Sequence, residues 1–358
     1  MSLKRFAWLL MAVAVIPAGR VLGEEGPRIL WRQKVAPRNV AVRDSLVVAV
    51  ADRRLVALDS STGQERWTAP LPNKEDRMSR PPILILDGVV ATGVGRTLFL
   101  FDAETGALRS QTEFGGGIQR LVGPPLLVQC ALSTGSAVDR ADPATGESRS
   151  RVEFGSIEGI WIENGTIVVQ SSRKSVEEAN ELSVMTGLDL DLKTLWSLRA
   201  DFLGFELVDG IPVVSQLSHE DRGASFHPID LTTGALGPAL PPRGTYESEW
   251  GGGTWEFEVP KSGEDGETIR RNDIRTGGAK WVVDLPFGGH ILVRSGDRIF
   301  WCGGAETSSI AEIAWETGKV RRICRGYPEL NELFESPRGL VGWAFDGSLL
   351  GIPDPCDL

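Results

Sequence analysis

The chain alternates short apolar runs with turn-forming polar segments. The runs LVALD (55–59) and LFLFD (98–102) each lead into the frame Asp-x-x-Thr-Gly, and a second short run such as QERWTA (64–69) follows the glycine. Apolar positions with a period of two, interrupted by a glycine-containing turn, are typical of two antiparallel strands joined by a hairpin. We therefore predict a β-hairpin at every copy of the frame.

The Asp-x-x-Thr-Gly frame repeats at a nearly constant interval. Its glycines lie 43, 40, 88, 43 and 41 residues apart, and a degenerate copy with Asp189 or Asp191 falls within the 88-residue gap. A period of about 40 to 45 residues predicts a repeat architecture in which every period is one structural unit. Intact copies begin at Asp59, Asp102, Asp142, Asp230 and Asp273, and a copy at Ala314 lacks only the aspartate.

The aspartate and the glycine of the frame suit a tight turn. The Asp59 carboxylate can accept hydrogen bonds from the backbone N–H groups that follow it, and Gly63 can adopt the positive φ of a bulged turn. Because the same aspartate recurs wherever the turn recurs, we assign these carboxylates to turn formation in preference to metal binding.

A second hairpin precedes each frame. Dipeptides such as Asn-Gly and Asp-Gly favour two-residue hairpin turns, and they divide the apolar sequence before the frame into two more strands. Each period then holds four short antiparallel strands, which is the composition of one blade of a β-propeller. The predicted turns are Asp87-Gly88, Asn164-Gly165, Asp209-Gly210 and Gly296-Asp297.

The two ends of the chain complete each other in this scheme. The segment GLVGWAFDGSLLGIP (339–353) supplies a second and a third strand, whereas RILWRQKVA (28–36) is a lone fourth strand with Trp31 in the place that Trp67 has in its repeat. Pairing of these segments would remove two free sheet edges. We predict an all-β, eight-bladed β-propeller with four antiparallel strands per blade, closed by the N-terminal strand on the C-terminal blade. Seven blades is the alternative.

The extended frame D-x-x-T-G-x-x-x-W, at Asp59 to Trp67 and at Asp273 to Trp281, resembles the tryptophan-docking repeat of the PQQ-type β-propellers. The resemblance implies that each tryptophan packs between neighbouring blades and locks them together. Other residues take the tryptophan position in four blades, so the lock is expected at only some junctions. These residues are Ser110, Ser150, Pro238 and Arg322.

Some members of this family are quinoprotein dehydrogenases, which carry an adjacent pair of cysteines against the cofactor and a calcium site in the central funnel. This chain has no Cys-Cys pair and only three histidines, so we assign it no cofactor, no metal and no catalytic residue. In repeat, size and export it is similar to the BamB-like, non-enzymatic branch of the family, whose lipid-anchor cysteine it lacks.

The N-terminus and the charge limit the compartment and the partners. Residues 1–23 combine Lys4 and Arg5 with an apolar stretch and a small-residue end, as in a secretory signal peptide. Residues 24–358 are then a single propeller domain, exported to the periplasm or the extracellular space, with no membrane span after cleavage. The formal net charge of −10 becomes −13 without the signal, which argues against electrostatic binding to nucleic acid or to an anionic membrane.

Four cysteines, Cys130, Cys302, Cys324 and Cys356, could form two disulfides in an oxidising compartment, in any of three connectivities. A bond between Cys324 and Cys356 is one hypothesis, because the tail returns beside the preceding blade, and free thiols in the core are the other. None of the cysteine spacings is typical of a zinc site.

Three consecutive blades carry a long segment between their second and third strands, at 170–183, 215–228 and 260–271, where the first two blades have short ones. Connectors of this kind emerge together on one face of a propeller, and variable loops on a rigid frame often carry function. Their mixed charges favour contact with a protein or peptide over a dry small-molecule pocket. The predicted contact residues are Arg173, Lys174, Glu177, Glu178, His219, Glu220, Asp221, Arg222, Lys261, Glu264 and Asp265.

Together these features predict a monomeric, exported, non-catalytic protein-interaction scaffold of the cell envelope. The alternative is an envelope enzyme, either a degenerate PQQ-dependent dehydrogenase or a propeller lyase or hydrolase that uses carboxylates around the central channel.

Overall fold

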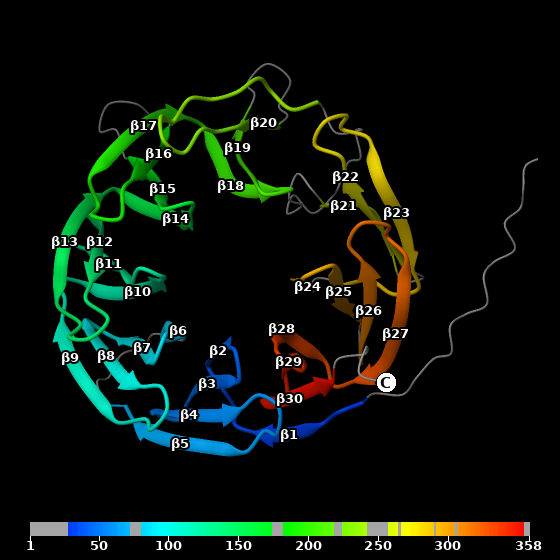
Figure 1. Cartoon of the computed structure of the whole chain (residues 1–358), viewed down its shortest axis with the longest axis horizontal. Helices are drawn as coiled ribbons and strands as arrows, with labels where there is room; N and C mark the ends of the chain where they lie inside the picture. The colour runs from blue at the N-terminus through cyan, green and yellow to red at the C-terminus, as the bar shows by residue number, and fades with distance from the viewer. Residues whose placement is uncertain are drawn as a thin grey trace, which may run out of the picture.

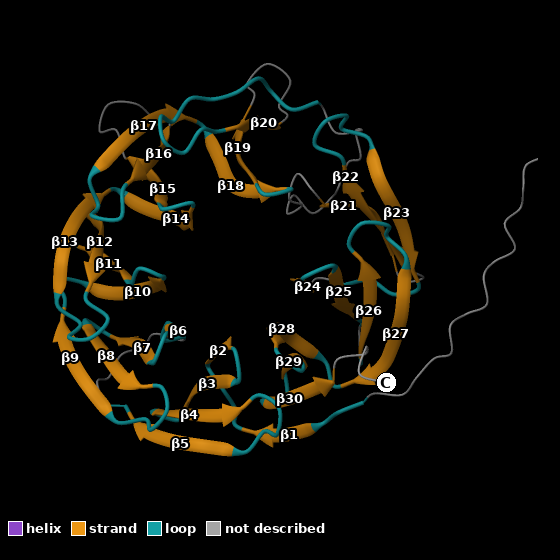
Figure 2. Ribbon diagram, in the orientation of Figure 1, coloured by secondary structure: helices purple, strands orange, loops and turns teal. Residues whose placement is uncertain are grey.

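The computed structural model describes residues 28–71, 80–173, 182–217, 224–241, 257–263, 266–289, 291–304 and 307–353. Thirty β-strands and no helix occur in these ranges (Figure 2), so the predicted all-β class is confirmed. No stretch of the described chain forms a helix long and apolar enough to cross a membrane. The predicted signal peptide, residues 1–23, lies outside the described ranges.

The described strands form eight separate antiparallel sheets arranged around a common centre (Figure 1), which we number 1 to 8 in chain order. Sheets 1 to 4 are made of β2 (Asn39–Arg43), β3 (Leu46–Ala51), β4 (Arg54–Asp59) and β5 (Glu65–Pro70); β6 (Ile83–Leu86), β7 (Val89–Val94), β8 (Thr97–Asp102) and β9 (Leu108–Glu113); β10 (Gly117–Val122), β11 (Leu127–Leu132), β12 (Gly135–Ala141) and β13 (Ser148–Phe154); and β14 (Ser156–Glu163), β15 (Thr166–Arg173), β16 (Leu182–Leu188) and β17 (Thr194–Ala200).

Sheets 5 to 8 contain the second half of the chain and its first strand. They are made of β18 (Phe202–Val208), β19 (Ile211–Leu217) and β20 (Ala224–Pro228); β21 (Phe257–Gly263), β22 (Gly266–Asn272) and β23 (Ala279–Leu285); β24 (Ile291–Ser295), β25 (Arg298–Gly303), β26 (Ser308–Ala314) and β27 (Val320–Tyr327); and β28 (Leu330–Ser336), β29 (Gly339–Ala344), β30 (Ser348–Pro353) and β1 (Trp31–Lys34).

The first strand pairs with the last strand, as the sequence predicts. β1 runs antiparallel to β30, with Trp31 opposite Gly351 and Lys34 opposite Ser348. The two strands lie side by side at the lower edge of Figure 1. Sheet 8 is therefore built from both ends of the described chain, and β1 covers the edge of β30 that would otherwise be unpaired.

A cluster of buried apolar side chains lies between each pair of neighbouring sheets. Val48 and Val90 belong to the cluster between sheets 1 and 2, and Val47 and Val341 belong to the cluster between sheets 1 and 8. The middle strands are apolar on both faces because each face packs on a different neighbour, and all six residues of β3 are accordingly buried. Burial of apolar area between sheets thus holds their arrangement.

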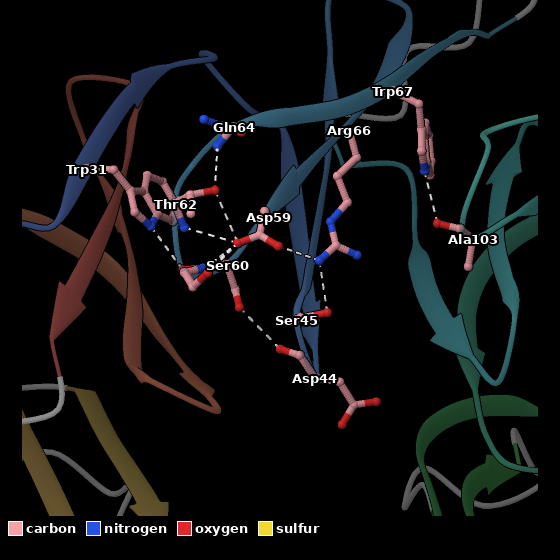
Figure 3. A network of polar contacts seen from close by, with 11 residues as sticks. Trp31, Asp44, Ser45, Asp59, Ser60, Thr62, Gln64, Arg66, Trp67 and Ala103 are labelled. Carbon is pink, nitrogen blue, oxygen red and sulfur yellow. Dashed lines mark hydrogen bonds and ion pairs between the residues drawn. The ribbon is translucent and has the colours of Figure 1, made fainter. Parts of the chain in front are cut away.

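The Asp-x-x-Thr-Gly frame forms the predicted turn. One carboxylate oxygen of Asp59 accepts hydrogen bonds from the backbone N–H groups of Ser61 and Thr62, both at 3.0 Å, and the other oxygen accepts one from Arg66 (Figure 3). Gly63 has a φ of 67° and donates its N–H to the Asp59 carbonyl. The same carboxylate-to-backbone bonds are made by Asp102, Asp142, Asp230 and Asp273.

In the degenerate copy of the frame, Asp189 performs this role. Its carboxylate accepts hydrogen bonds from the N–H groups of Asp191 (2.8 Å) and Lys193 (2.9 Å). This turn is one residue shorter than the intact ones, and Leu192 takes the conformation of the frame glycine with a φ of 65°, which costs a non-glycine residue energy. Asp191 is free to form an ion pair with Arg140 of sheet 3.

Sheet 5 departs from the four-strand pattern after β20. The chain makes one isolated bridge, Ile229 with Leu236, and Leu240 then donates its N–H to the Phe226 carbonyl at 2.7 Å. Pro238 lies between these contacts and has no N–H to donate, so a continuous strand is interrupted there.

Candidate interaction site

Four tryptophans join neighbouring sheets through the same contact. In each, the indole N–H donates to the backbone carbonyl of the second residue of the next sheet's frame, as Figure 3 shows for two of them. These bonds explain why the frame and the tryptophan recur together. The pairs are Trp31 with Ser60 (2.9 Å), Trp67 with Ala103 (2.9 Å), Trp196 with Leu231 (2.7 Å) and Trp281 with Trp315 (2.8 Å).

The frame glycine is required by this contact as well as by the turn. Gly106 has a φ of 71°, and a Cβ atom there would lie 2.6 Å from the ring of Trp67. A side chain at this position would therefore strain the backbone and displace the indole.

The remaining junctions lack the indole, as the sequence predicts. Ser110 takes the tryptophan position in sheet 2, and its hydroxyl oxygen is buried without a hydrogen-bond partner. Between sheets 3 and 4, where Ser150 takes that position, the ion pair of Arg140 with Asp191 crosses the junction. The tryptophan lock is therefore partial.

Each sheet has two ends, which we call the turn rim, where the Asp-x-x-Thr-Gly turns lie, and the connector rim, where the second and third strands of a sheet are joined. Sheets 4 and 5 have their turn rims on the same side of the molecule. Thr166 contacts the Leu231 carbonyl of the sheet 5 frame at the turn rim, and Gln170 donates to the Phe202 carbonyl near the other end at 3.1 Å. The ends of β15 at Arg173 and of β19 at Leu217, which lead into the connectors 174–181 and 218–223, consequently lie at the same rim.

The predicted contact residues fall almost entirely in these two connectors or in the next one. Arg173 and Lys261 lie in β15 and β21, and the other nine residues lie outside the described ranges. The structure shortens all three predicted connectors. Residues 170–173 and 182–183 belong to β15 and β16, residues 215–217 and 224–228 to β19 and β20, and residues 260–263 and 266–271 to β21 and β22. The third connector changes most, because it was predicted over 260–271 and only residues 264 and 265 separate its strands.

The inner strands of sheets 3, 4 and 5 carry a bulge near the connector rim. The pairing of β10, β14 and β18 with their neighbours skips Gln119, Glu158 and Leu203, respectively. All three bulged residues are exposed, Leu203 to 55%. Bulges re-aim side chains at the ends of sheets, so three neighbouring sheets present an amide, a carboxylate and an apolar group near the connector rim.

Two of the three bulged side chains, Gln119 and Glu158, accept hydrogen bonds from buried glutamine side chains. Gln170 donates to the Glu158 carboxylate at 2.7 Å, and Gln129 donates to the Gln119 side-chain oxygen at 3.1 Å. Both donors are 4% exposed. The bulged side chains are thus held by the sheet beneath them, which keeps this part of the rim ordered for a contact.

Asp139 is a buried carboxylate that the sequence analysis did not single out. Its side chain is 2% exposed and accepts a hydrogen bond from Ser148 (2.8 Å) and one from Arg151 (3.5 Å). Burial raises the pKa of this carboxyl, against the opposing effect of Ser148. Burial also raises the pKa of the Cys130 thiol to about 12, so this thiol is protonated and unreactive at neutral pH.

Arg271 is a second buried charge that sequence reasoning missed. It has no exposed side-chain area, donates to the Trp315 carbonyl at 2.8 Å and to Asp209 at 2.6 Å, and stacks on the Trp315 ring at 3.7 Å. Lys280 pairs with the same aspartate at 2.5 Å. This network ties sheets 5, 6 and 7 together. The signal in the sequence is the charged pair Arg270-Arg271, where the first two repeats have apolar residues before the frame.

No disulfide joins Cys130, Cys302 and Cys324 to one another in the described ranges. Cys130 and Cys302 are buried, Cys324 is partly buried, and Cys356 lies outside these ranges. The hypothesis of a bond between Cys324 and Cys356 therefore stays a prediction.

The side chains in the described ranges that could bind a metal ion are not arranged as a site for a quinone and calcium would require. No three His, Cys, Asp or Glu side chains come together there in a group that could hold a metal ion. The most regular acidic set, the frame aspartates, is bound to the backbone of its own turns. We therefore derive no chemical step through such a centre.

Comparisons with solved structures identify the architecture. BamB from Moraxella catarrhalis has 15% sequence identity and a TM-score of 0.57, over 90% of this chain and 98% of that chain. Quinohemoprotein alcohol dehydrogenase from Comamonas testosteroni has 13% identity and a TM-score of 0.60, over 90% and 76%. Sqt1 from Saccharomyces cerevisiae has 11% identity and a TM-score of 0.62, over 91% and 98%. At these identities the likeness is one of fold.

The sequence matches none of the curated proteins with which it was compared. A family model described as outer membrane protein assembly factor BamB matches residues 20–190, which contain the first three intact frames and the start of the degenerate one. The predicted resemblance is therefore confirmed: residues 20–190 carry the PQQ-like repeat of the BamB family model, within a β-propeller fold that this chain shares with BamB and with PQQ-type dehydrogenases.

Proposed function

We propose that this chain is an exported, non-catalytic scaffold of the cell envelope that binds a protein partner at the connector rim of sheets 4 and 5. The proposal rests on one observation: β15 and β19, which lead into the connectors 174–181 and 218–223, end at the same rim of adjacent sheets, where Glu158 and Leu203 are exposed. A rigid frame that presents adjacent loops with mixed charges suits a protein contact. The family described as an outer membrane assembly factor supports the assignment to the envelope.

We further propose that the eight sheets are the blades of one closed, monomeric propeller. The pairing of β1 with β30 and the apolar cluster that joins sheets 8 and 1 support this closure. Deletion of residues 28–36 should then expose the β30 edge and lower the stability of the whole molecule, measured by chemical denaturation. Unchanged stability would contradict a closed ring.

Site-specific photocrosslinking in cells tests the partner surface. A photoreactive amino acid at Glu178 or at Glu220 should capture the same discrete protein, because the two connectors belong to one surface. A photoreactive residue at Asp52, in the short exposed connector of sheet 1, is the matched control. Equal capture at Asp52, or different products from the two connectors, would contradict the proposal.

Cofactor loading tests the proposal that the chain is not a quinone-dependent enzyme. The purified protein, mixed with pyrroloquinoline quinone and Ca²⁺ and passed through a desalting column, should retain no quinone absorbance. Retained stoichiometric quinone would favour the degenerate dehydrogenase instead.

A further inference from the structure

A groove with a volume of about 400 Å³ opens between sheets 1 and 2 at the turn rim. Its walls come from the β2–β3 turn and from β5 on one side, and from the β6–β7 turn and the frame of sheet 2 on the other. Figure 3 shows the first wall, with Asp44, Ser45 and Arg66, and the docking of Trp67 on Ala103 that joins the two sheets. Leu46 and Leu86, each 7% exposed, contribute apolar surface to the lining.

The three arginines that line the groove already have carboxylate partners. Arg43 pairs with Asp87 at 2.6 Å and Arg109 pairs with Asp102 at 2.5 Å. Arg66 pairs with the frame aspartate of its own sheet and also donates to the Ser45 hydroxyl at 2.9 Å. An anionic ligand would have to displace these internal carboxylates.

Two carboxylates of the groove remain available. The Asp44 side chain is 86% exposed, and its contact with Arg43 is long, at 3.8 Å. The Glu104 side chain is exposed and makes no hydrogen bond or ion pair within the described ranges. The two come from different sheets, so their carboxylates lie on opposite walls. The uncompensated charge of the groove is therefore negative.

We propose that this groove binds the side chain of a lysine or arginine from a basic segment of a protein partner. The alkyl stem of such a residue can lie along Leu46 and Leu86 while its charged end binds Asp44 and Glu104. The net charge of −10 adds long-range attraction for a basic segment. The groove opens at the turn rim and shares no residue with the connectors, so it is a second contact surface, independent of the first.

A blocked peptide, acetyl-Ala-Lys-Ala-Lys-Ala-amide, serves as the probe, and its affinity for the full chain is measured by calorimetry at low ionic strength. The double variant D44N/E104Q should bind it about three to ten times more weakly, because two exposed ion pairs are lost. Asn at position 44 tolerates the φ of 50° found there, so the turn should persist.

The double variant D52N/E147Q is the matched control. It removes the same two charges from exposed residues outside the groove lining, Asp52 also having a positive φ, and it should bind the peptide as the parent does. Equal weakening in both variants would overturn the groove and leave only an effect of net charge.

Two further ligands test whether the groove prefers a basic peptide to an acidic peptide or to a free polyamine. The glutamate version of the peptide should not bind. Spermidine should bind more weakly than the lysine peptide, because it offers no peptide backbone to the walls of the groove. Binding of the glutamate peptide, or spermidine affinity equal to that of the lysine peptide, would overturn the assignment to a basic protein segment.

Discussion

Replacement of Trp67 by alanine tests whether the indole contact holds two sheets together. The Trp67 side chain is 7% exposed, its ring packs on Gly106, and its N–H donates to the Ala103 carbonyl at 2.9 Å. Loss of a buried aromatic side chain of this size costs about 3 to 5 kcal/mol in the free energy of unfolding.

The hydrogen bond can be separated from the packing. Trp67→Phe keeps an aromatic ring but removes the indole N–H, so it should cost the hydrogen bond, about 0.5 to 1.5 kcal/mol, and a smaller packing loss. Ser110→Ala is the matched control, because Ser110 takes the same position in sheet 2. Its hydroxyl oxygen is buried without a hydrogen bond, so its removal should leave stability unchanged or slightly raised.

Guanidinium chloride denaturation of the three variants, followed by circular dichroism, measures these differences. The expected order of stability is Ser110→Ala at the level of the parent, then Trp67→Phe, then Trp67→Ala. If Trp67→Ala and Ser110→Ala were equally stable, the indole would contribute nothing to the junction, and the role assigned to the repeated frame would be refuted.

Two pH-dependent predictions follow from buried and turn carboxylates. The raised pKa of Asp139 means that the folded state holds its proton more tightly than the unfolded state, so stability should fall as the pH rises above about 4. In Asp139→Asn this decline should be smaller, as measured by denaturation at several pH values between 4 and 8, and an unchanged slope would contradict the assignment. The pKa of Asp59 lies well below its usual range, mainly because of the hydrogen bond from Arg66, so its contribution is present above about pH 4 and is lost on acidification. Asp59→Asn should therefore lose less stability than the parent between pH 5 and pH 2, and a parallel loss would contradict the turn role of this carboxylate.

Local sequence signals were sufficient for the repeat and its turns. Asp59 and Gly63 act within one turn, and their chemistry is complete within a few residues, so their role could be predicted without the rest of the chain. The pairing of the strand that carries Trp31 with the last strand could also be inferred, because the repeat indicates which strand is missing from the last sheet.

Contacts between distant charged residues could not be predicted in the same way. The segment 260–271 is rich in charge and was expected to be a loop, yet Glu267 and Arg271 are buried in β22. Their partners lie elsewhere: the Gly289 N–H donates to Glu267 at 2.7 Å, and Arg271 binds Asp209. A strand can bury charge where another sheet supplies the opposite charge or a backbone group, and this is visible only after folding.

The composition of sheet 8 has a consequence for biosynthesis. β1 is the first described strand to leave the ribosome, whereas its partner β30 is the last described strand. Until β30 has been synthesised, β1 has an unpaired backbone edge, and joining it to β30 closes a loop of more than 300 residues. The β1–β30 pair thus cannot form before the last described strand exists, and a chain that stops short of β30 keeps an unpaired β1 edge that can pair with other strands.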